Sequence, residues 1–332
     1  MMPNSNLQQH YHAETQRFFN TPPTQPIQGS LIKTFWQMII NKQQFMPPKA
    51  LPQQRPNWQD FLAPSAKIKL IWFGHSSFML RIADKTLLID PVFAQTVSPF
   101  GLMMYRFQPP AITLDELPHI DYILYTHNHY DHLDKAVVKH FIQHQTSFIV
   151  PLGLDKILQQ WGISSQRIQC LDWWQNINIS SFKITATPAR HNTARGLFDK
   201  DKTLWCGYVF ETQHEKIYYS GDSSYGDGRH FKQIGQHWQG FDLALIENGQ
   251  YHNYWYDNHL FPQQTIQAVQ DVQAQCFMPV HWGAYALSTH IWNEPVQQSI
   301  TLAQQFNIAT LTPMLGQVVD LDSITSHWWE NI

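Results

Sequence analysis

The chain has 332 residues, of which 43% are hydrophobic and 14% charged, and its formal net charge is −3. This composition is typical of a globular protein, and because no run of Lys or Arg exceeds two residues, we expect no nucleic-acid partner. The widely spaced Cys170, Cys206 and Cys276 fit neither a disulfide framework nor a thiolate zinc site, so we expect a cytoplasmic, reducing location.

Residues 1–65 are predicted to form an N-terminal arm that packs on a domain spanning residues 66–332. The arm is rich in Gln and Pro around one apolar island at 31–46, which is too short to form a core alone. The first residues lack the basic start and apolar core of a secretory signal, and no window approaches 18 uninterrupted apolar residues, so we expect no transmembrane segment.

The apolar island could form a helix that packs on the core or one that faces a membrane, with Lys33 and Lys42 at its edges. Core packing is the commoner fate of such a stripe, and we expect it here. Peripheral membrane contact therefore stays open, as does a homodimer. The apolar residues concerned are Leu31, Ile32, Phe35, Trp36, Met38, Ile39 and Ile40.

From residue 67 onward, short β-rich runs alternate with helical patterns. Runs rich in β-branched and aromatic residues predict strands at 68–73, 78–82, 86–89, 122–125, 147–150, 182–186, 208–211, 217–219, 243–246 and 277–280. Apolar spacing of three to four residues after a Pro or Asp predicts helices at 133–144, 154–161, 262–274 and 295–306. Strands in hairpin clusters that also alternate with helices predict an α/β fold in which helices lie outside sheets.

Residues 125–134, YTHNHYDHLD, contain three histidines and two aspartates directly after a predicted strand. His127 and His129 point the same way if the chain leaves that strand extended, so they can bind one ion. Asp131 and His132 fall on the turn before the next helix and can face a second ion. Chance would produce this pattern roughly 0.003 times in a chain of this composition. Nitrogen and oxygen ligands without thiolate suit Zn²⁺, Mn or Fe.

Two ions need more ligands than this segment holds. His191, Asp222 and His281 each follow a predicted strand, and an open α/β scaffold builds its sites at the carboxyl ends of strands. Spacing alone leaves each of them about equally well explained as an ordinary strand-end residue.

The segment Thr126-His-Asn-His-Tyr-Asp-His132 resembles the signature of the metallo-β-lactamase fold superfamily. The pieces Thr187-Pro-Ala-Arg-His191, Ser220-Gly-Asp222 and Pro279-Val-His281 follow in the same order. Upstream, Trp72-Phe-Gly-His75 and Leu88-Ile-Asp90 are similar to the branch that contains N-acyl-phosphatidylethanolamine-hydrolysing phospholipase D and its bacterial relatives. That branch tends to have Gln where this chain has Arg190.

The resemblance implies a four-layer αβ/βα sandwich with two zinc ions at its edge. One ion would be held by His127, His129 and His191. The other would be held by Asp131, His132 and His281, with Asp222 bridging the two. It also implies a hydrolase that uses a metal-bridging hydroxide, with Asp131 as the catalytic residue that orients the hydroxide and accepts its proton.

A phosphodiester, such as that of an N-acyl phospholipid, is the expected substrate, and a small molecule with a lactone or amide bond is the alternative, because activated hydroxide attacks carbonyl carbon as well. A non-catalytic metal scaffold is less consistent with so many ligands, since a structural zinc is normally closed by four.

Three further residues are expected beside the metals. His75 and Asp90 sit at strand ends and could orient ligating imidazoles. His259 follows the strand at 243–246 in an aromatic loop and is expected to contact the substrate without binding metal. A local hydrogen bond within the turn or loop is the alternative for each.

Overall fold

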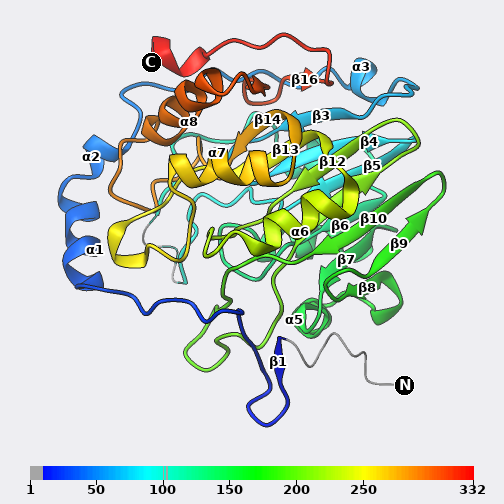
Figure 1. Ribbon diagram of the computed structural model, residues 1–332. Helices are drawn as coiled ribbons and strands as arrows, with labels where there is room; N and C mark the ends of the chain where they lie inside the picture. The colour runs from blue at the N-terminus through cyan, green and yellow to red at the C-terminus, as the bar shows by residue number, and fades with distance from the viewer. Residues whose placement is uncertain (1–9, 100, 102–103) are drawn as a thin grey trace.

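Two mixed sheets face each other at the centre of the molecule and helices cover their outer sides, as the computed structural model shows (Figure 1). The structure describes residues 10–99, 101 and 104–332. Residues 1–9 of the predicted arm and the side chains of Leu31 and Phe35 lie outside the described part.

Both sheets contain seven strands. The first has the order β16 (Val318–Val319), β3 (Lys69–Trp72), β4 (Phe78–Ile82), β5 (Lys85–Ile89), β6 (Tyr122–Leu124), β7 (Ser147–Pro151) and β8 (Ile168–Leu171). The second has the order β15 (Ala309–Thr310), β14 (Ala274–Val280), β13 (Phe241–Glu247), β12 (Lys216–Tyr219), β11 (Gly207–Glu211), β10 (Phe182–Thr187) and β9 (Asn176–Ile179). A separate hairpin joins β1 (Tyr11–His12) to β2 (Arg17–Phe18). Every strand predicted from the sequence is present, and the short strands β8, β9, β15 and β16 were not predicted.

Strand β5 shows why the predicted strands carry apolar side chains on both faces of the sheet. Leu87 and Ile89 enter the core between the sheets, whereas Leu88 points to the helical side, because side chains alternate along a strand. Val137 and Leu158 of the covering helices meet Leu88 in this second core. The predicted four-layer αβ/βα sandwich is confirmed.

The helices in the described part of the chain are α1 (Leu31–Ile40), α2 (Lys42–Phe45), α3 (Trp58–Leu62), α4 (Lys135–His140), α5 (Leu154–Gln160), α6 (Arg229–Trp238), α7 (Pro262–Asp271) and α8 (Glu294–Gln305). The four helices predicted at 133–144, 154–161, 262–274 and 295–306 are present with shifted ends, as α4, α5, α7 and α8. Short 3₁₀ turns are η2 (Leu114–Glu116), η3 (Phe141–Gln143), η4 (Ser165–Arg167), η5 (Asn253–Trp255) and η6 (Trp328–Asn331). Helix α4 begins later than the predicted residue 133, because the Asp134 side chain caps it by accepting from the Ala136 N–H.

Helix α6 was not predicted from the sequence. Its buried positions, Phe231, Ile234 and Trp238, have helical spacing, but polar residues and Gly235 interrupt them. A Cβ at Gly235 would lie 2.2 Å from the Asp271 carbonyl oxygen, so the glycine permits the close approach of α6 to the end of α7. Tertiary packing therefore decides a helix that local propensity disfavours.

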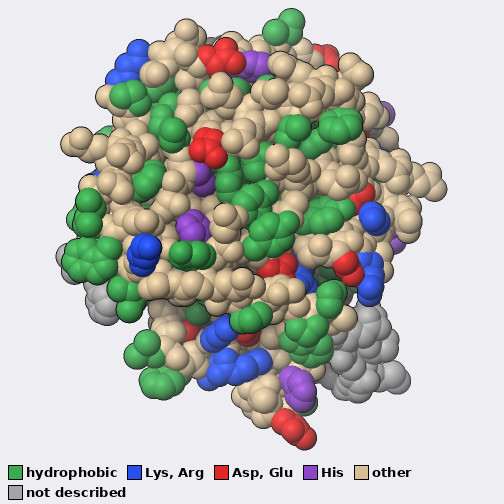
Figure 2. Space-filling view, turned by 60° about the vertical axis from the view of Figure 1, so that its left-hand side comes forward, with side chains coloured by type: hydrophobic (Ala, Val, Ile, Leu, Met, Phe, Trp, Pro, Cys, Tyr) green, Lys and Arg blue, Asp and Glu red, His purple; other side chains and the backbone are tan. Residues whose placement is uncertain are grey.

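The arm runs along the outside of the domain, and α1 lies at one edge of the molecule (Figure 1). The expected core packing of the apolar island is wrong for Ile32, Trp36, Ile39 and Ile40, which are 72%, 56%, 46% and 74% exposed. These residues are called the apolar face of α1 below. Figure 2 brings this side forward and shows hydrophobic side chains over much of it.

Other arm residues do reach the interior, as the buried side chains of Phe18, Phe45, Leu51 and Phe61 show. None of the helices in the described part of the chain has the length and apolar character required to cross a membrane.

Candidate metal centre

The predicted ligands converge at one edge of the sandwich. Strands β5, β6, β7 and β8 run parallel, as do β12, β13, β14 and β15, so each group ends its strands at a common edge. The segment with His127 follows β6, and the other predicted ligands follow β10, β12 and β14. These predicted ligands, called the ligand cluster below, are His127, His129, Asp131, His132, His191, Asp222 and His281.

A first group brings together the ring nitrogens of His127, His129 and His191. The Nδ1 atom of His129 lies 3.0 Å from His127 Nε2 and 3.1 Å from His191 Nε2. Ligands of one tetrahedral zinc ion, with bonds of roughly 2.0 to 2.1 Å, are about 3.3 Å apart, so the spacing suits a single ion. Asp222 Oδ2 lies 3.7 Å from His127 Nε2 and 3.6 Å from His191 Nε2.

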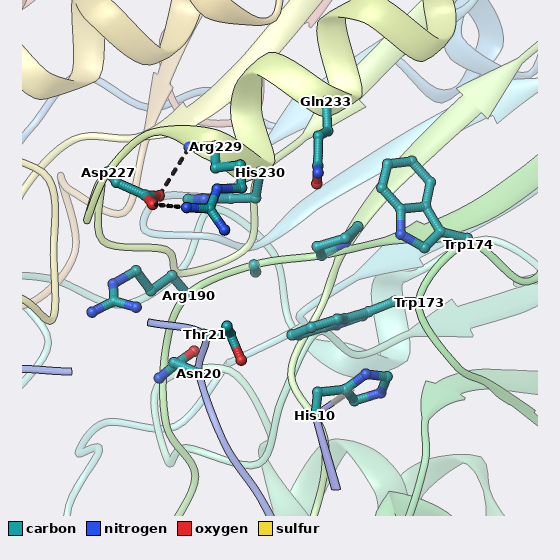
Figure 3. Close-up of a pocket in the computed structure, with 12 residues that line it drawn as sticks. His10, Asn20, Thr21, Trp173, Trp174, Arg190, Asp227, Arg229, His230 and Gln233 are labelled. Atoms are coloured by element: carbon teal, nitrogen blue, oxygen red, sulfur yellow. Dashed lines mark hydrogen bonds and ion pairs between the residues drawn. The ribbon is translucent and has the colours of Figure 1, made fainter. Parts of the chain in front are cut away.

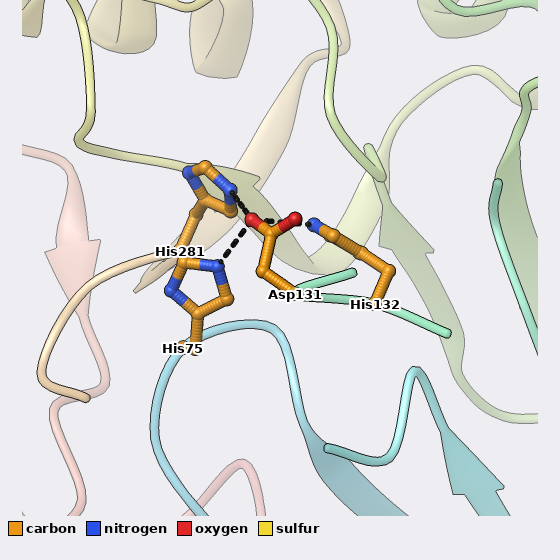
Figure 4. A group of neighbouring side chains, drawn as sticks. All are labelled: His75, Asp131, His132 and His281. Carbon is orange, nitrogen blue, oxygen red and sulfur yellow. Dashed lines mark hydrogen bonds and ion pairs between the residues drawn. The ribbon is translucent and has the colours of Figure 1, made fainter. Parts of the chain in front are cut away.

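A second group gathers around Asp131, whose carboxylate faces the rings of His75, His132 and His281 (Figure 4). Asp131 Oδ2 lies 3.4 Å from His281 Nε2 and 3.8 Å from His132 Nε2. Asp222 joins this group too, at 3.1 Å from each of these two nitrogens. Asp222 therefore lies between the two groups.

Unused polar atoms show that the cluster fits metal ions. His132 Nε2, His281 Nε2 and Asp222 Oδ1 are buried and have no hydrogen-bond partner among the described residues. Such orphaned atoms are costly unless something else satisfies them. Imidazole nitrogens and carboxylate oxygens are the donors that Zn²⁺, Mn and Fe accept.

Charge in the cluster also favours cations. Burial raises the pKa of Asp222, but the neighbouring His132 and His281 outweigh it and hold this pKa well below the usual range. Burial lowers the pKa of His127 and His191 well below the usual value, so both imidazoles are neutral, as ligation requires. Burial opposes charge on His281, but the neighbouring carboxylates of Asp222 and Asp131 raise its pKa to about 10.

Asp90 lies behind His132. Its Oδ2 atom is 2.9 Å from His132 Nδ1, and it also accepts from the hydroxyls of Thr126 and Tyr219 at 2.6 and 2.7 Å. The carboxylate is fully buried. These contacts fix the ring orientation of His132.

His75 and His259 also border the cluster. His75 Nε2 lies 2.9 Å from Asp131 Oδ2, and burial together with the nearby His281 lowers the pKa of His75 to about 3. His259 stacks on His281 with ring centroids 4.9 Å apart, and its Nδ1 lies 2.7 Å from Glu247 Oε2.

Glu247 was not singled out from the sequence. It ends β13, is buried, accepts from the Ser223 N–H at 2.7 Å, and has its pKa raised by burial. A carboxylate directly after the apolar run at 243–246 was the signal that could have revealed it.

The sequence matches the beta-lactamase superfamily domain over residues 85–282. The chain belongs to the metallo-β-lactamase superfamily. It is 31% identical over 251 residues to N-acyl-phosphatidylethanolamine-hydrolyzing phospholipase D 1 of Caenorhabditis elegans, covering 72% of this chain and 70% of that one. An uncharacterized protein of Mycobacterium tuberculosis is 33% identical over 301 residues, covering 89% of this chain and 80% of its own.

Among solved structures, the isothiocyanate hydrolase from Delia radicum gut bacteria is similar in fold, with a TM-score of 0.61 and 18% identity, covering 76% of this chain and 98% of that one. The predicted family, and the branch resembling the phospholipase, are confirmed. As a member of the metallo-β-lactamase superfamily, the protein is a metal-dependent hydrolase with His/Asp clusters that could hold metal ions.

Proposed function

We propose that this metallo-β-lactamase-fold protein is a two-zinc phosphodiesterase acting on a phospholipid of the N-acyl phosphatidylethanolamine class. The observation that carries the proposal is the position of Asp222, whose oxygens lie 3.1 Å from His132 and His281 and 3.6 Å from His191. One carboxylate shared by two ligand groups is the arrangement of a two-metal site. Zinc is the preferred ion for this donor set, with Mn or Fe as alternatives.

The ligands divide by geometry. His127, His129 and His191 would hold one ion, and Asp131, His132 and His281 the other, with Asp222 between them. A pair of bound divalent ions supplies a water activated near neutral pH and positive charge for the group under attack.

Asp131 is assigned a second role besides ligation. The hydrogen bond from His75 fixes its carboxylate, and burial is outweighed by His132 and the other neighbouring histidines, which keep its pKa well below the usual range. An anionic, oriented carboxylate can align the attacking water and take up its proton.

His259 is assigned a contact with the substrate. Glu247 engages its Nδ1 atom, so Nε2 is the ring atom through which it would donate a hydrogen bond to the phosphate. Donors preorganised at developing charge are among the larger contributions to catalysis.

A lipid substrate is supported by the phospholipase D activity for which the Caenorhabditis elegans relative is named and by the apolar face of α1. Residues 15–59 contain no Asp or Glu, but they include Arg17, Lys33, Lys42, Lys49 and Arg55. An exposed apolar stripe edged by cations suits the interface of an anionic membrane. We therefore include peripheral membrane contact through α1 in the proposal.

Metal analysis and paired substrates test this function. Protein purified without chelator should contain two zinc ions per chain and should hydrolyse bis(p-nitrophenyl) phosphate and N-acyl phosphatidylethanolamine in vesicles. Hydrolysis of lactones or amides without cleavage of either phosphodiester would show that the substrate is a carbonyl compound and not a phosphodiester. Two bound ions without hydrolysis of any of these substrates would favour a non-catalytic metal-binding scaffold.

A further inference from the structure

Residues 20–28 of the arm cross two loops that border the ligand cluster. One loop carries Arg190 and His191, and the other, residues 253–259, carries Asp257 and His259. We propose that this segment, called the strap below, positions His191 and His259 and that Arg190 is the residue through which it does so. The inference rests on the proposed function, because it concerns the same site.

Arg190 connects three parts of the chain. Its guanidinium binds Asp257 through Nε at 3.2 Å and Nη2 at 2.5 Å. It also donates to the Pro22 carbonyl and, at 3.0 Å, to the Pro23 carbonyl. The Arg190 and Asp257 side chains are only 7% and 9% exposed, so little solvent screens the pair.

The strap adds its own bonds to both loops. Asn20 Nδ2 donates to the His191 carbonyl at 2.6 Å. The Gln25 N–H donates to Asp257 Oδ2 at 2.9 Å, and the Gln28 N–H donates to the Tyr254 carbonyl at 2.7 Å. The backbone of His191 and the loop with His259 are therefore both tied to the strap.

The two loops are also tied to each other next to the cluster. His191 Nδ1 lies 3.2 Å from the Asn258 carbonyl oxygen, which fixes the ring whose Nε2 faces His129. His259 is the next residue along the chain. A shift of the loop at Asp257 therefore moves the partner that orients His191 and also moves His259 itself.

Two cavities that Arg190 lines leave the strap loosely packed. One, of about 450 Å³, has Asn20, Thr21 and Arg190 in its lining (Figure 3). The other, of about 510 Å³, is lined by Pro22, Pro23, Arg190 and Asp257 among others. Because strap residues line both cavities, a few polar contacts rather than continuous packing hold the strap here.

The test compares Arg190→Gln, Asn20→Ala and their double variant in the full zinc-loaded chain. Arg229→Gln is the matched control, since Arg229 lines the same first cavity but is 64% exposed and pairs with Asp227. Three quantities are measured: hydrogen exchange at the Gln25 and Gln28 amides, the rate of zinc loss to a chelator, and kcat and KM for bis(p-nitrophenyl) phosphate.

Arg190→Gln should speed exchange at both amides by about tenfold or more, speed zinc loss by about 10- to 100-fold and lower kcat by a similar factor, with KM changed less. Asn20→Ala should act in the same direction. The double variant should be no worse than Arg190→Gln, because both changes release one strap. The control should match the wild type.

Faster exchange with wild-type zinc loss and kcat would overturn the proposal, since the strap would then be a surface attachment only. The proposal would also be overturned if the fold-changes of Arg190→Gln and Asn20→Ala multiplied in the double variant, because the two residues would then act independently. Arg190→Gln leaves the buried Asp257 carboxylate without its cationic partner, which could prevent folding. In that case Arg190→Gln is combined with Asp257→Asn, which removes the buried charge. This double variant should lose zinc as fast as is expected for Arg190→Gln. If the wild type binds zinc but cleaves no phosphodiester, the proposed function fails, while the zinc-loss rates still decide the role of the strap.

Discussion

The ligand cluster and the apolar face of α1 differ in how far the rest of the protein surrounds their side chains. His127, His132 and His281 are fully buried, and each has a polar neighbour from another strand end. Ile32 and Ile40 are mostly exposed. The comparison separates two tasks: chemistry needs donors held by several contacts, whereas docking to a surface needs side chains left without an internal partner.

Removing the whole arm is the most drastic way to break this comparison. A fragment that starts at Ser65 should yield no soluble protein, because the arm buries Phe18, Phe45, Leu51 and Phe61 and leaves apolar surface when it is lost. Expression and solubility are measured, with the full chain carrying Ile32→Ser as a control that should stay soluble. A soluble, active fragment would show that the arm is dispensable.

Loss of one ligand should give the next largest effect. His281→Ala and His127→Ala should each lower zinc occupancy and reduce the rate of hydrolysis by roughly 10³-fold or more, since catalytic metal ions lower the activation free energy by several kcal/mol. Elemental analysis and kinetics measure both. His214→Ala, at an exposed loop position, should behave as wild type. Full occupancy in His281→Ala would remove this residue from the ligand set.

Asp131→Asn separates ligation from proton transfer within the cluster. The variant should keep much of its metal and lose about 10²- to 10⁴-fold in kcat, because an amide cannot accept the proton of the attacking water. Asp115→Asn is the control, since that side chain is 91% exposed. A near-normal kcat at full metal content would rule out the proton-accepting role.

His259→Ala should leave both metals bound and lower kcat by about 10²- to 10³-fold, as expected for loss of one donor to a developing oxyanion. Metal content and kcat are measured on the same preparation. A change in KM alone would limit His259 to binding the substrate.

The smallest effect should come from the apolar face of α1. Trp36→Ser or Ile40→Ser should weaken binding to anionic vesicles by about tenfold each, since burying one such side chain contributes roughly 1.5 to 3 kcal/mol. Hydrolysis of bis(p-nitrophenyl) phosphate should not change. Unaltered vesicle binding, or a wild-type dimer that dissociates in these variants, would indicate that the apolar face of α1 contacts a protein and not a membrane.

The sequence predicted the sheets well, because short β-rich runs bounded by turn residues mark their main strands, and each predicted ligand stands after such a run. It did not predict the exposure of Trp36 and Ile40. A hydrophobic stripe specifies an amphipathic helix, but whether another element covers it depends on the whole chain. Helix α6 was missed for the same reason, since Gly235 lowers the local helix propensity and only the close packing against the end of α7 explains why a glycine stands there.

Glu247 and the bonds of Arg190 were also beyond the sequence. Glu247 meets Ser223 and His259 from distant positions in the chain, and Arg190 meets Pro22 across 168 positions. No local pattern records such pairings.

The two sheets supply the ligands jointly. Asp131 and His132 follow β6 of the first sheet, whereas Asp222 and His281 follow β12 and β14 of the second. Main-chain bonds between His75 and residues 281–282 already join the sheets at this edge, at 2.6 and 2.9 Å. An ion bound there would act as a cross-link of the folded state, one that is absent from the unfolded chain. Above the dissociation constant, each tenfold increase in free zinc would then add about 1.4 kcal/mol to the free energy of unfolding for each ion bound. The melting temperature of the protein would therefore rise with the concentration of free zinc.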